Sequence, residues 1–188
     1  MNILIPMAGE GSRFKINGYE KPKPLITVDG VPMIKLATDS LNIEGQYIFV
    51  VRKYEDPSNN LELKKLLTSI QSDCIIVEVD KLTRGSAETC LFASEFIDND
   101  DPLIITNCDQ FMQWDSQGFV DFVDQDCDGA VVTYTSSDPK NSFVEVGAQG
   151  NITLFKEKES ISDIALIGLH YWKRGSDFVS SSRDMIIR

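Results

Sequence analysis

The chain has 188 residues, of which 42% are hydrophobic and 25% charged, and its formal net charge is −11. This length and composition are typical of one globular domain with a substantial core. The acidic balance argues against non-specific binding to nucleic acid, which depends on neutralising backbone phosphates. No apolar run approaches the roughly 20 residues that a membrane-spanning helix needs. We therefore expect a protein that binds neither nucleic acid nor membranes.

The expected location of the protein is the cytoplasm. The N-terminus has no basic region ahead of a hydrophobic segment and a cleavage site, so it predicts no secretory signal. Four cysteines lie largely within apolar segments and form no Cys-x-x-Cys pair: Cys74, Cys90, Cys108 and Cys127. This pattern predicts reduced thiols in a cytosolic protein, rather than disulfides or a zinc site.

A glycine-rich and basic segment, residues 7–25, follows a short apolar strand predicted at residues 3–5. Gly9 and Gly11 allow their backbone N–H groups to converge on an anion. The segment also carries four cations, Arg13, Lys15, Lys21 and Lys23. Because backbone amides, Arg and Lys are the groups that bind phosphate, this signature segment predicts a site for a small polyanion. A solvated loop that happens to contain glycine and lysine is the alternative.

Strands and helices are predicted to alternate through the first 110 residues. Continuous apolar runs of strand length lie at residues 3–5, 47–51, 74–79 and 103–106. Apolar residues at helical spacing lie between them, at residues 33–41, 59–70 and 86–97. We expect Pro32 in the first turn of the first helix and Ser86 as the N-cap of the third. This order predicts an open, mostly parallel sheet with helices on both faces, whose ligands bind beyond the carboxyl ends of the strands.

The second half of the chain is predicted to consist mainly of strands. After a short helix at residues 118–124, strand-like runs lie at residues 130–134, 143–146, 152–155 and 164–172. Because no linker or internal repeat separates the halves, we expect one domain over residues 1–188 with a β-rich C-terminal part. The final residues, 184–188, read as the start or middle of a further apolar element.

The run Gly9-x-Gly11-Ser12-Arg13, followed by Lys21-Pro22-Lys23-Pro24-Leu25, resembles the signature loop of the sugar-phosphate nucleotidyltransferases, the NDP-sugar pyrophosphorylases. That family has Gly-x-Gly-Thr/Ser-Arg, a spacer, and then Pro-Lys-Pro-Leu. Two other nucleotide motifs do not fit. The segment has no Gly-x-x-x-x-Gly-Lys-Ser/Thr, and Phe14 stands where a dinucleotide fingerprint starting at Gly9 needs its third glycine.

The resemblance implies a Rossmann-like three-layer fold of the nucleotide-diphospho-sugar transferase type. Family members normally continue for several tens of residues more, which implies that this chain is truncated at its C-terminus. A role in a bacterial capsule or surface-polysaccharide pathway would fit a member of this size. The sequence leaves open whether the protein forms a homo-oligomer.

The resemblance also implies which residues bind the nucleotide. The matching positions are Ala8, Gly9, Gly11, Ser12, Arg13, Gly85 and Ser86. The last two lie in a segment, residues 83–87, that is similar to the family's Gly-Thr/Ala-Ala element, where a glycine lets the nucleoside lie against the chain. A capped helix start that binds no ligand is the alternative for this segment.

Asp109 is the candidate metal ligand. It follows the strand predicted at residues 103–106, at the same sheet edge as the signature segment. A carboxylate there is well placed to hold Mg²⁺ against nucleotide phosphates, although a turn-forming Asp is also common after strands. In the family an Asp at the end of this strand is a metal ligand. The resemblance therefore implies Mg²⁺ on Asp109, with Arg13 and Lys23 as the other catalytic residues.

Residues near the C-terminal end are candidates for binding the acceptor. Residues 155–158 look like the family's Glu-Lys-Pro element, in which Glu157 would contact sugar hydroxyls and Lys158 the phosphate. Here Glu159 replaces the proline, and an ordinary charged hairpin is the alternative. Gly168 lies in a strand that resembles the one lining the sugar pocket. The only histidine, His170, is expected to be structural.

The resulting expectation is an enzyme that transfers NMP from an NTP, with a pyrimidine favoured, to a sugar 1-phosphate and releases pyrophosphate. Such chemistry depends on positioning and charge neutralisation rather than on a covalent protein intermediate. Two alternatives remain. One is nucleotidyl transfer to a non-sugar phosphorylated acceptor, and the other is a noncatalytic nucleotide-sensing domain of the same fold.

Overall fold

The computed structural model describes residues 1–125 and 127–187 of the chain. Within this part, eight strands form the main sheet: β1 (Asn2–Met7), β4 (Gln46–Arg52), β5 (Ile75–Val79), β6 (Leu103–Ile105), β7 (Gly129–Thr135), β8 (Ser142–Val146), β9 (Ile152–Glu157) and β10 (Ile164–Trp172). Their order is β5-β4-β1-β6-β10-β8-β9, and β7 also pairs with β10. A separate hairpin consists of β2 (Thr27–Val28) and β3 (Val31–Pro32).

The sheet has a parallel half and an antiparallel half. β1 is parallel to both β4 and β6, and β4 is parallel to β5. β10 is antiparallel to β6, β7 and β8. These pairings confirm the predicted open α/β sheet with a β-rich C-terminal part. Because the parallel strands all run in one direction, their carboxyl ends lie at one edge of the sheet.

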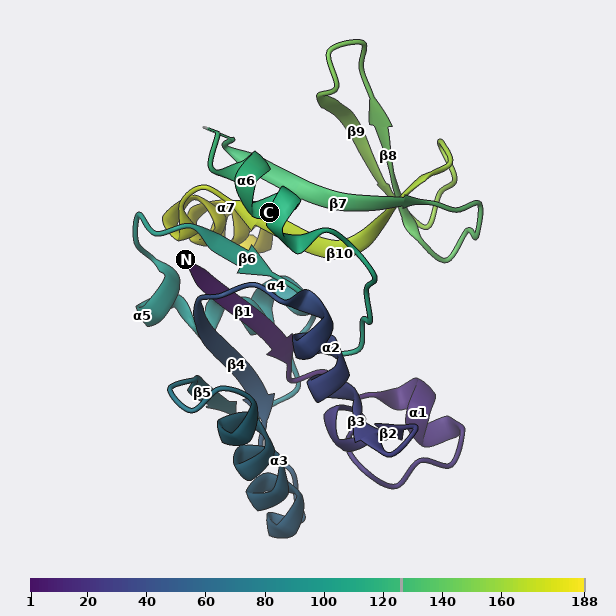
Figure 1. Ribbon diagram of the computed structural model, residues 1–188. Coiled ribbons are helices and arrows are strands. Elements are labelled where there is room, and N and C mark those ends of the chain that lie inside the picture. The colour runs from purple at the N-terminus through teal and green to yellow at the C-terminus, as the bar shows by residue number, and fades with distance from the viewer. Residues whose placement is uncertain (126, 188) are drawn as a thin grey trace.

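Helices cover both faces of the sheet (Figure 1). The helical elements are α1 (Ser12–Ile16), the 3-10 turn η1 (Lys23–Leu25), α2 (Met33–Leu41), α3 (Pro57–Ile70), α4 (Ser86–Leu91), α5 (Ser94–Ile97), α6 (Ser116–Val123) and α7 (Gly175–Ile187). Apolar residues of α2, α3 and α6 pack on one face, and those of α4, α5 and α7 pack on the other. No helix among the described residues has the length and apolar character to cross a membrane.

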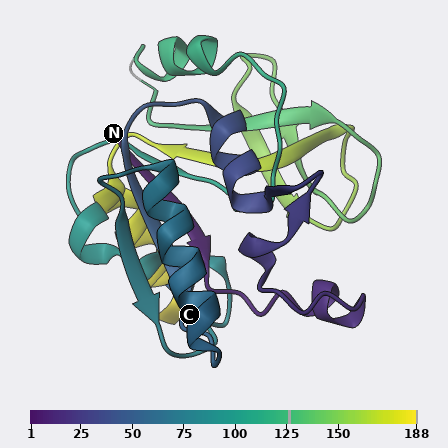
Figure 2. The ribbon, with the colours of Figure 1, turned by 60° about the horizontal axis from the view of Figure 1, so that its bottom comes forward.

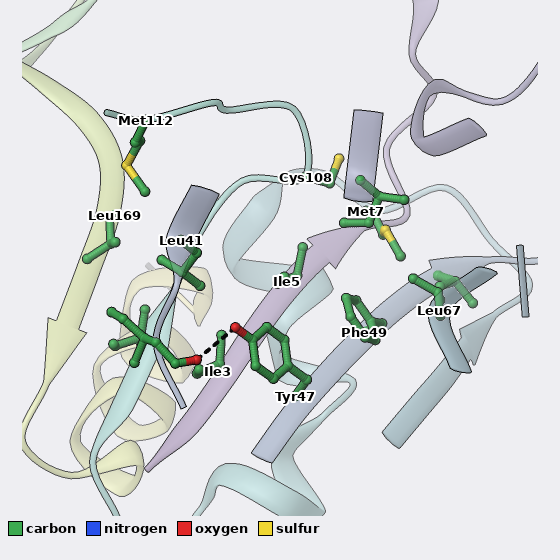
Figure 3. Packing of buried hydrophobic residues seen from close by; sticks show 14 of the residues in the cluster. Ile3, Ile5, Met7, Leu41, Tyr47, Phe49, Leu67, Cys108, Met112 and Leu169 are labelled. Carbon is green, nitrogen blue, oxygen red and sulfur yellow. Dashed lines mark hydrogen bonds between the residues drawn. The ribbon is translucent and has the colours of Figure 1, made fainter. Parts of the chain in front are cut away.

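The core has two layers because the side chains of each strand alternate between the two faces. In β1, Ile3 and Ile5 point to the layer of α2 and α3, whereas Leu4 points to the layer of α4 and α7. Figure 3 shows the first layer, where the Tyr47 hydroxyl donates a 2.9 Å hydrogen bond to the carbonyl of Ile43. Burial raises the pKa of Tyr47 to about 12. The continuous apolar runs of β1, β4 and β6 are therefore confirmed as strands buried on both sides, whereas the edge strand β5 is only partly buried.

The structure corrects three predicted helix boundaries. The helix predicted at 86–97 is divided into α4 and α5 around Phe92 and Ala93. Gly85, rather than Ser86, occupies the N-cap of α4, and the carboxylate of Glu88 accepts a hydrogen bond from the backbone N–H of Arg84. Pro32 lies in β3 at the N-cap of α2, one residue before the helix begins. The residue at which a helix begins or ends depends on local backbone geometry, which the spacing of apolar residues does not predict.

The structure contains two helices that the sequence did not predict, α1 and α7. The signature segment contains the short helix α1, which has no buried residue and hence no apolar face to reveal it. Residues 184–188 were predicted to be the start or middle of an apolar element, but residues 184–187 are the last turn of α7, and Arg188 lies outside the described residues. In Figures 1 and 2, the part of the chain that carries α1, β2 and β3 extends beyond the carboxyl end of β1. This placement sets the position of the candidate site.

Candidate active site

A pocket of about 380 Å³ lies at the carboxyl end of β1. Its lining residues come from β1, the signature segment and the loop after β6: Pro6, Met7, Gly9, Gly11, Ser12, Arg13, Phe14, Lys23, Pro24, Cys108 and Asp109. We name it the central pocket. The structure thus brings together all three residues predicted to be catalytic, Arg13, Lys23 and Asp109, although about a hundred residues separate the first from the last.

Gly11 forms the turn that places Arg13 in the pocket. Its φ of 66° lies in the left-handed region, which glycine adopts without strain. Its carbonyl accepts hydrogen bonds from the N–H groups of Phe14 and Lys15, at 2.9 and 3.2 Å, so α1 begins immediately after the glycine. A β-carbon at Gly11 would also lie 3.4 Å from the Cβ of Lys23. The turn at Gly11 therefore sets the start of the helix that carries Arg13, next to Lys23.

Lys23 and Asp109 face each other across the central pocket. The Nζ atom of Lys23 lies 2.6 Å from Oδ2 of Asp109, and their side chains are 27% and 35% exposed. Lys23 also lies over the ring of Phe14, 5.9 Å from its centroid. The backbone of this lysine is anchored through Pro24 and Leu25 of η1, which are both buried. The ion pair thus joins the signature segment to the loop after β6.

Buried residues hold the loop that carries Asp109. β6 ends at Ile105, and the N–H of Thr106 still donates to the carbonyl of Leu4 at 3.1 Å. The adjacent Cys108 is 4% exposed, and burial raises the pKa of its thiol to about 11, with Lys23 opposing the shift. The thiol is therefore protonated near neutral pH and forms an apolar part of the wall.

Gly168 supports the same loop from the other side. It lies in an irregularity of β10, where the register against β7 shifts, and its φ is +87°. A β-carbon at this position would overlap the side-chain amide of Asn107, which itself donates a 3.3 Å hydrogen bond to Gln110. Gly168 is not among the residues that line the central pocket. The close contact with Asn107 explains why this position needs a glycine. The binding of an acceptor by Gly168 stays a prediction.

The four cations of the signature segment differ in their partners. Lys21 pairs with Glu62 of α3 at 2.6 Å, and Lys23 pairs with Asp109. Across residues 1–125 and 127–187, Arg13 and Lys15 form no ion pair. Arg13 is therefore the cation of the central pocket that is free to bind an anion without first losing a protein partner.

A second pocket of about 620 Å³ shares Gly9, Gly11 and Lys23 with the central pocket. It extends toward the ends of β4 and β5, and we name it the lateral pocket. Its far walls include Arg52, Tyr54, Asp80 and Leu82. The guanidinium of Arg52 lies 5.4 Å from the centroid of the Tyr54 ring, and burial raises the pKa of Tyr54 to about 12. None of these four residues was predicted to belong to a site, although Arg52 and Asp80 directly follow predicted strands.

Other predicted site residues lie outside the central pocket. Ala8 is fully buried, backbone included, and does not line the central pocket. Gly85 and Ser86 begin α4, and the φ of Gly85 is an extended 172°. Glu157 is the last residue of β9 and forms an exposed ion pair with the adjacent Lys158, with 2.9 Å between their charged atoms. The structure does not bring these side chains to Asp109, and their binding roles remain predictions.

The donor set for a metal ion is small. In the described part of the chain, no cluster of three or more His, Cys, Asp or Glu residues is arranged to hold a metal. Among the described residues that line the central pocket, Asp109 is the single carboxylate. Mg²⁺ commonly binds through one or two carboxylates together with phosphate oxygens and water. The residues present therefore fit a metal ion that a nucleotide would largely coordinate.

Comparisons with known proteins agree with this geometry. A nucleoside-diphosphate-sugar pyrophosphorylase from Vibrio cholerae RC9 superposes with a TM-score of 0.79 and 25% sequence identity, covering 99% of this chain and 79% of that one. A UDP-glucose pyrophosphorylase complexed with UDP-glucose superposes with a TM-score of 0.73 and 18% sequence identity, and the match covers 97% of this chain and 79% of that one. No curated protein sequence matches the chain. The sequence model for nucleotidyl transferases matches residues 3–181, so the chain belongs to the nucleotidyl transferase family and is a nucleotidyltransferase.

Proposed function

We propose that this enzyme transfers a nucleoside monophosphate from a nucleoside triphosphate to a sugar 1-phosphate and releases pyrophosphate. The observation that carries the proposal is the convergence of Gly9, Gly11, Arg13, Lys23 and Asp109 on the central pocket. Backbone amides, a guanidinium, an ammonium and a carboxylate are together suited to a triphosphate and its counterion. Family membership and the likeness to nucleoside-diphosphate-sugar pyrophosphorylases support the same chemistry.

Each charged residue has a distinct proposed role. Arg13, which forms no ion pair with any residue that the structure describes, holds the β and γ phosphates together with the amides of the signature segment. Lys23 neutralises charge around the reacting phosphate. The acceptor's phosphate oxygen attacks the α-phosphorus, and pyrophosphate leaves on the opposite side. Catalysis then comes from alignment and charge neutralisation, which requires no protein nucleophile.

The proposed cofactor is Mg²⁺. Nucleotidyltransferases of this family generally use divalent metal ions. Asp109 would hold the ion, which when bound supplies positive charge against the phosphates. The remaining coordination positions would be filled by the nucleotide and water, because no second carboxylate lines the central pocket within the described residues.

The lateral pocket is the proposed place of the nucleoside, with a pyrimidine base favoured. It is continuous with the central pocket through Gly9, and its wall at Asp80 and Leu82 belongs to the loop that leads to Gly85. A β-carbon built at Gly9 or Gly85 meets no atom within 4 Å. Neither glycine has a φ in the left-handed region. Since the fold itself does not require glycine at either position, close approach of a ligand would explain both.

The acceptor roles of Glu157, Lys158 and Gly168 complete the proposal. Glu157 and Lys158 pair only with each other among the described residues, and both side chains are more than half exposed. An exposed ion pair of this kind is weak, so either group can exchange its partner for a ligand. Glu157 would then bind sugar hydroxyls and Lys158 the acceptor phosphate.

Binding of nucleoside triphosphates tests the donor site. Thermal unfolding in the presence of UTP, CTP, dTTP, ATP or GTP, each with and without Mg²⁺, should show a shift for one or two of them. A ligand at about 100 times its dissociation constant adds roughly 2.7 kcal/mol to the free energy of unfolding. The Arg13→Ala variant should lose most of this shift. The stabilising donor is then incubated with a panel of sugar 1-phosphates and with phosphorylated non-sugar compounds, and pyrophosphate release is measured.

The two readouts separate the possible answers. Release of pyrophosphate only with non-sugar acceptors would overturn the sugar 1-phosphate assignment. Binding of a triphosphate without release in the presence of any acceptor would favour a nucleotide sensor instead. If no triphosphate stabilises the wild-type chain, the proposed donor site is wrong for this chain.

Replacing Gly9 by alanine should weaken triphosphate binding about tenfold while the free energy of unfolding without nucleotide stays within about 0.5 kcal/mol of wild type. The added methyl group meets no protein atom within 4 Å, so it occupies space that only a ligand would use. Titration calorimetry with the stabilising triphosphate, next to urea unfolding, measures both effects. Unchanged affinity would show that the nucleotide does not approach Gly9.

A further inference from the structure

Two of the three charged groups that line the central pocket, Lys23 and Asp109, bind each other. Lys23 Nζ lies 2.6 Å from Asp109 Oδ2, and both side chains are about two thirds buried. Over residues 1–125 and 127–187, neither group forms any other ion pair. A short contact between an ammonium and a carboxylate is among the stronger polar contacts in proteins.

This contact occupies the position that a cation on Asp109 needs. A divalent ion on this carboxylate would stand close to the ammonium of Lys23, and the two positive charges would repel each other strongly in a partly buried pocket. No neighbouring carboxylate in the described pocket lining offers the ion a second position. A metal ion on Asp109 is therefore disfavoured while Lys23 keeps its contact with Oδ2.

The lysine is the partner that is able to move. Its backbone is fixed in η1 by the buried Pro24 and Leu25, but its four-carbon stem allows Nζ to swing within the pocket. Asp109 has a short side chain on a loop held by the buried Cys108. Gly9 and Gly11, whose amides would bind phosphate, line the same pocket as Lys23. A phosphate on these amides would draw the ammonium away from Asp109.

We propose that Lys23 acts as an internal competitor for the metal position on Asp109, and that the anionic phosphates release it. The free chain then binds divalent metal ions weakly, and the metal binds together with the nucleotide or after it. The identity of the anion as a nucleotide rests on the function proposed above. The competition between Lys23 and a metal ion for Asp109 does not.

Metal binding by the nucleotide-free protein tests the proposal directly. Mn²⁺ binding is followed by electron paramagnetic resonance for wild type, Lys23→Met and Lys23→Gln. Both variants keep a long side chain over Phe14 but lose the positive charge. We expect each variant to bind Mn²⁺ roughly tenfold more tightly than wild type. The double variant Lys23→Met/Asp109→Asn should lose this gain, because the vacated carboxylate is absent.

Lys21→Met is the matched control. Lys21 belongs to the same segment and forms an ion pair of the same 2.6 Å length, but its partner is Glu62 in α3. The substitution causes an equal change in net charge without opening Asp109. It should leave Mn²⁺ affinity within about twofold of wild type. An equal gain in Lys21→Met and Lys23→Met would show that net charge alone controls metal binding, and it would overturn the proposal.

Inorganic triphosphate gives a second, opposite readout that involves neither a nucleobase nor turnover. Without metal, Lys23→Met should bind triphosphate roughly tenfold more weakly than wild type, because the ammonium that should follow the phosphates is gone. The same substitution thus strengthens metal binding and weakens anion binding. If Lys23→Met and Lys23→Gln fold like wild type but bind Mn²⁺ no more tightly, Lys23 does not compete for Asp109. A wild-type protein that releases no pyrophosphate would contradict the proposed function and leave the Mn²⁺ result intact.

Discussion

Replacing Asp109 by asparagine should reduce pyrophosphate release roughly 10²- to 10³-fold, the usual loss when one preorganised electrostatic group is removed from an active site. Asparagine has nearly the same shape but no negative charge, so it is a poor ligand for Mg²⁺. The loop itself should remain in place, because Cys108 and the contact between Asn107 and Gly168 hold it. Steady-state rates on the donor and acceptor that support turnover, measured across a range of Mg²⁺ concentrations, check this prediction.

The Asp109→Asn variant also frees Lys23, and this second effect must be separated from the first. The free energy of unfolding is expected to change by less than about 1 kcal/mol, because the ion pair is partly exposed to solvent. A loss of activity with unchanged urea unfolding therefore reflects the chemistry of the pocket. Turnover within about threefold of wild type, at any Mg²⁺ concentration, would exclude Asp109 from catalysis.

The main features of the sheet and of the central pocket follow from local patterns in the sequence. Residues 47–51 are all apolar because helices cover both faces of β4. A continuous apolar run of this kind can be recognised in the sequence without knowledge of the tertiary structure. Since the carboxyl ends of parallel strands meet at one edge, the segment after β1 and Asp109 after β6 were expected at the same place. Their shared pocket confirms that expectation.

The ion-pair partner of each lysine, in contrast, depends on the folded positions of residues far apart in the sequence, which no local sequence pattern predicts. Lys21 and Lys23 are two residues apart in the same segment, yet one pairs with Glu62 on α3 and the other with Asp109. The direction of each side chain depends on the turn at Pro22 and the start of η1. The lateral pocket could not be predicted for a related reason. Arg52 and Asp80 line the same pocket only because β4 and β5 pair in the folded sheet.

Gly175 is another residue whose importance only the structure reveals, and replacing it by alanine should lower the free energy of unfolding by about 2–3 kcal/mol. It is the buried first residue of α7, and an added β-carbon would overlap the backbone carbonyl of Ile97 at the end of α5. A backbone atom, unlike the tip of a side chain, has no alternative rotamer. Moreover, the N–H of Gly175 donates to the carbonyl of Asp101 and that of Ser176 to Asn99, both at 2.9 Å, so the helix start is not free to slide away.

Gly129→Ala provides the comparison for this prediction. An added β-carbon at Gly129 would meet the carbonyl of Tyr171 at 3.4 Å, an ordinary contact, and the residue is exposed at the start of β7. Alanine there should change the free energy of unfolding by less than about 1 kcal/mol, and it loses less backbone entropy than glycine on folding. Urea unfolding of the two variants gives the difference directly. Equal stabilities would mean that α5 and α7 separate at little cost. A large loss in Gly175→Ala alone would show that the start of α7 is tightly docked against the end of α5 and the turn that follows it.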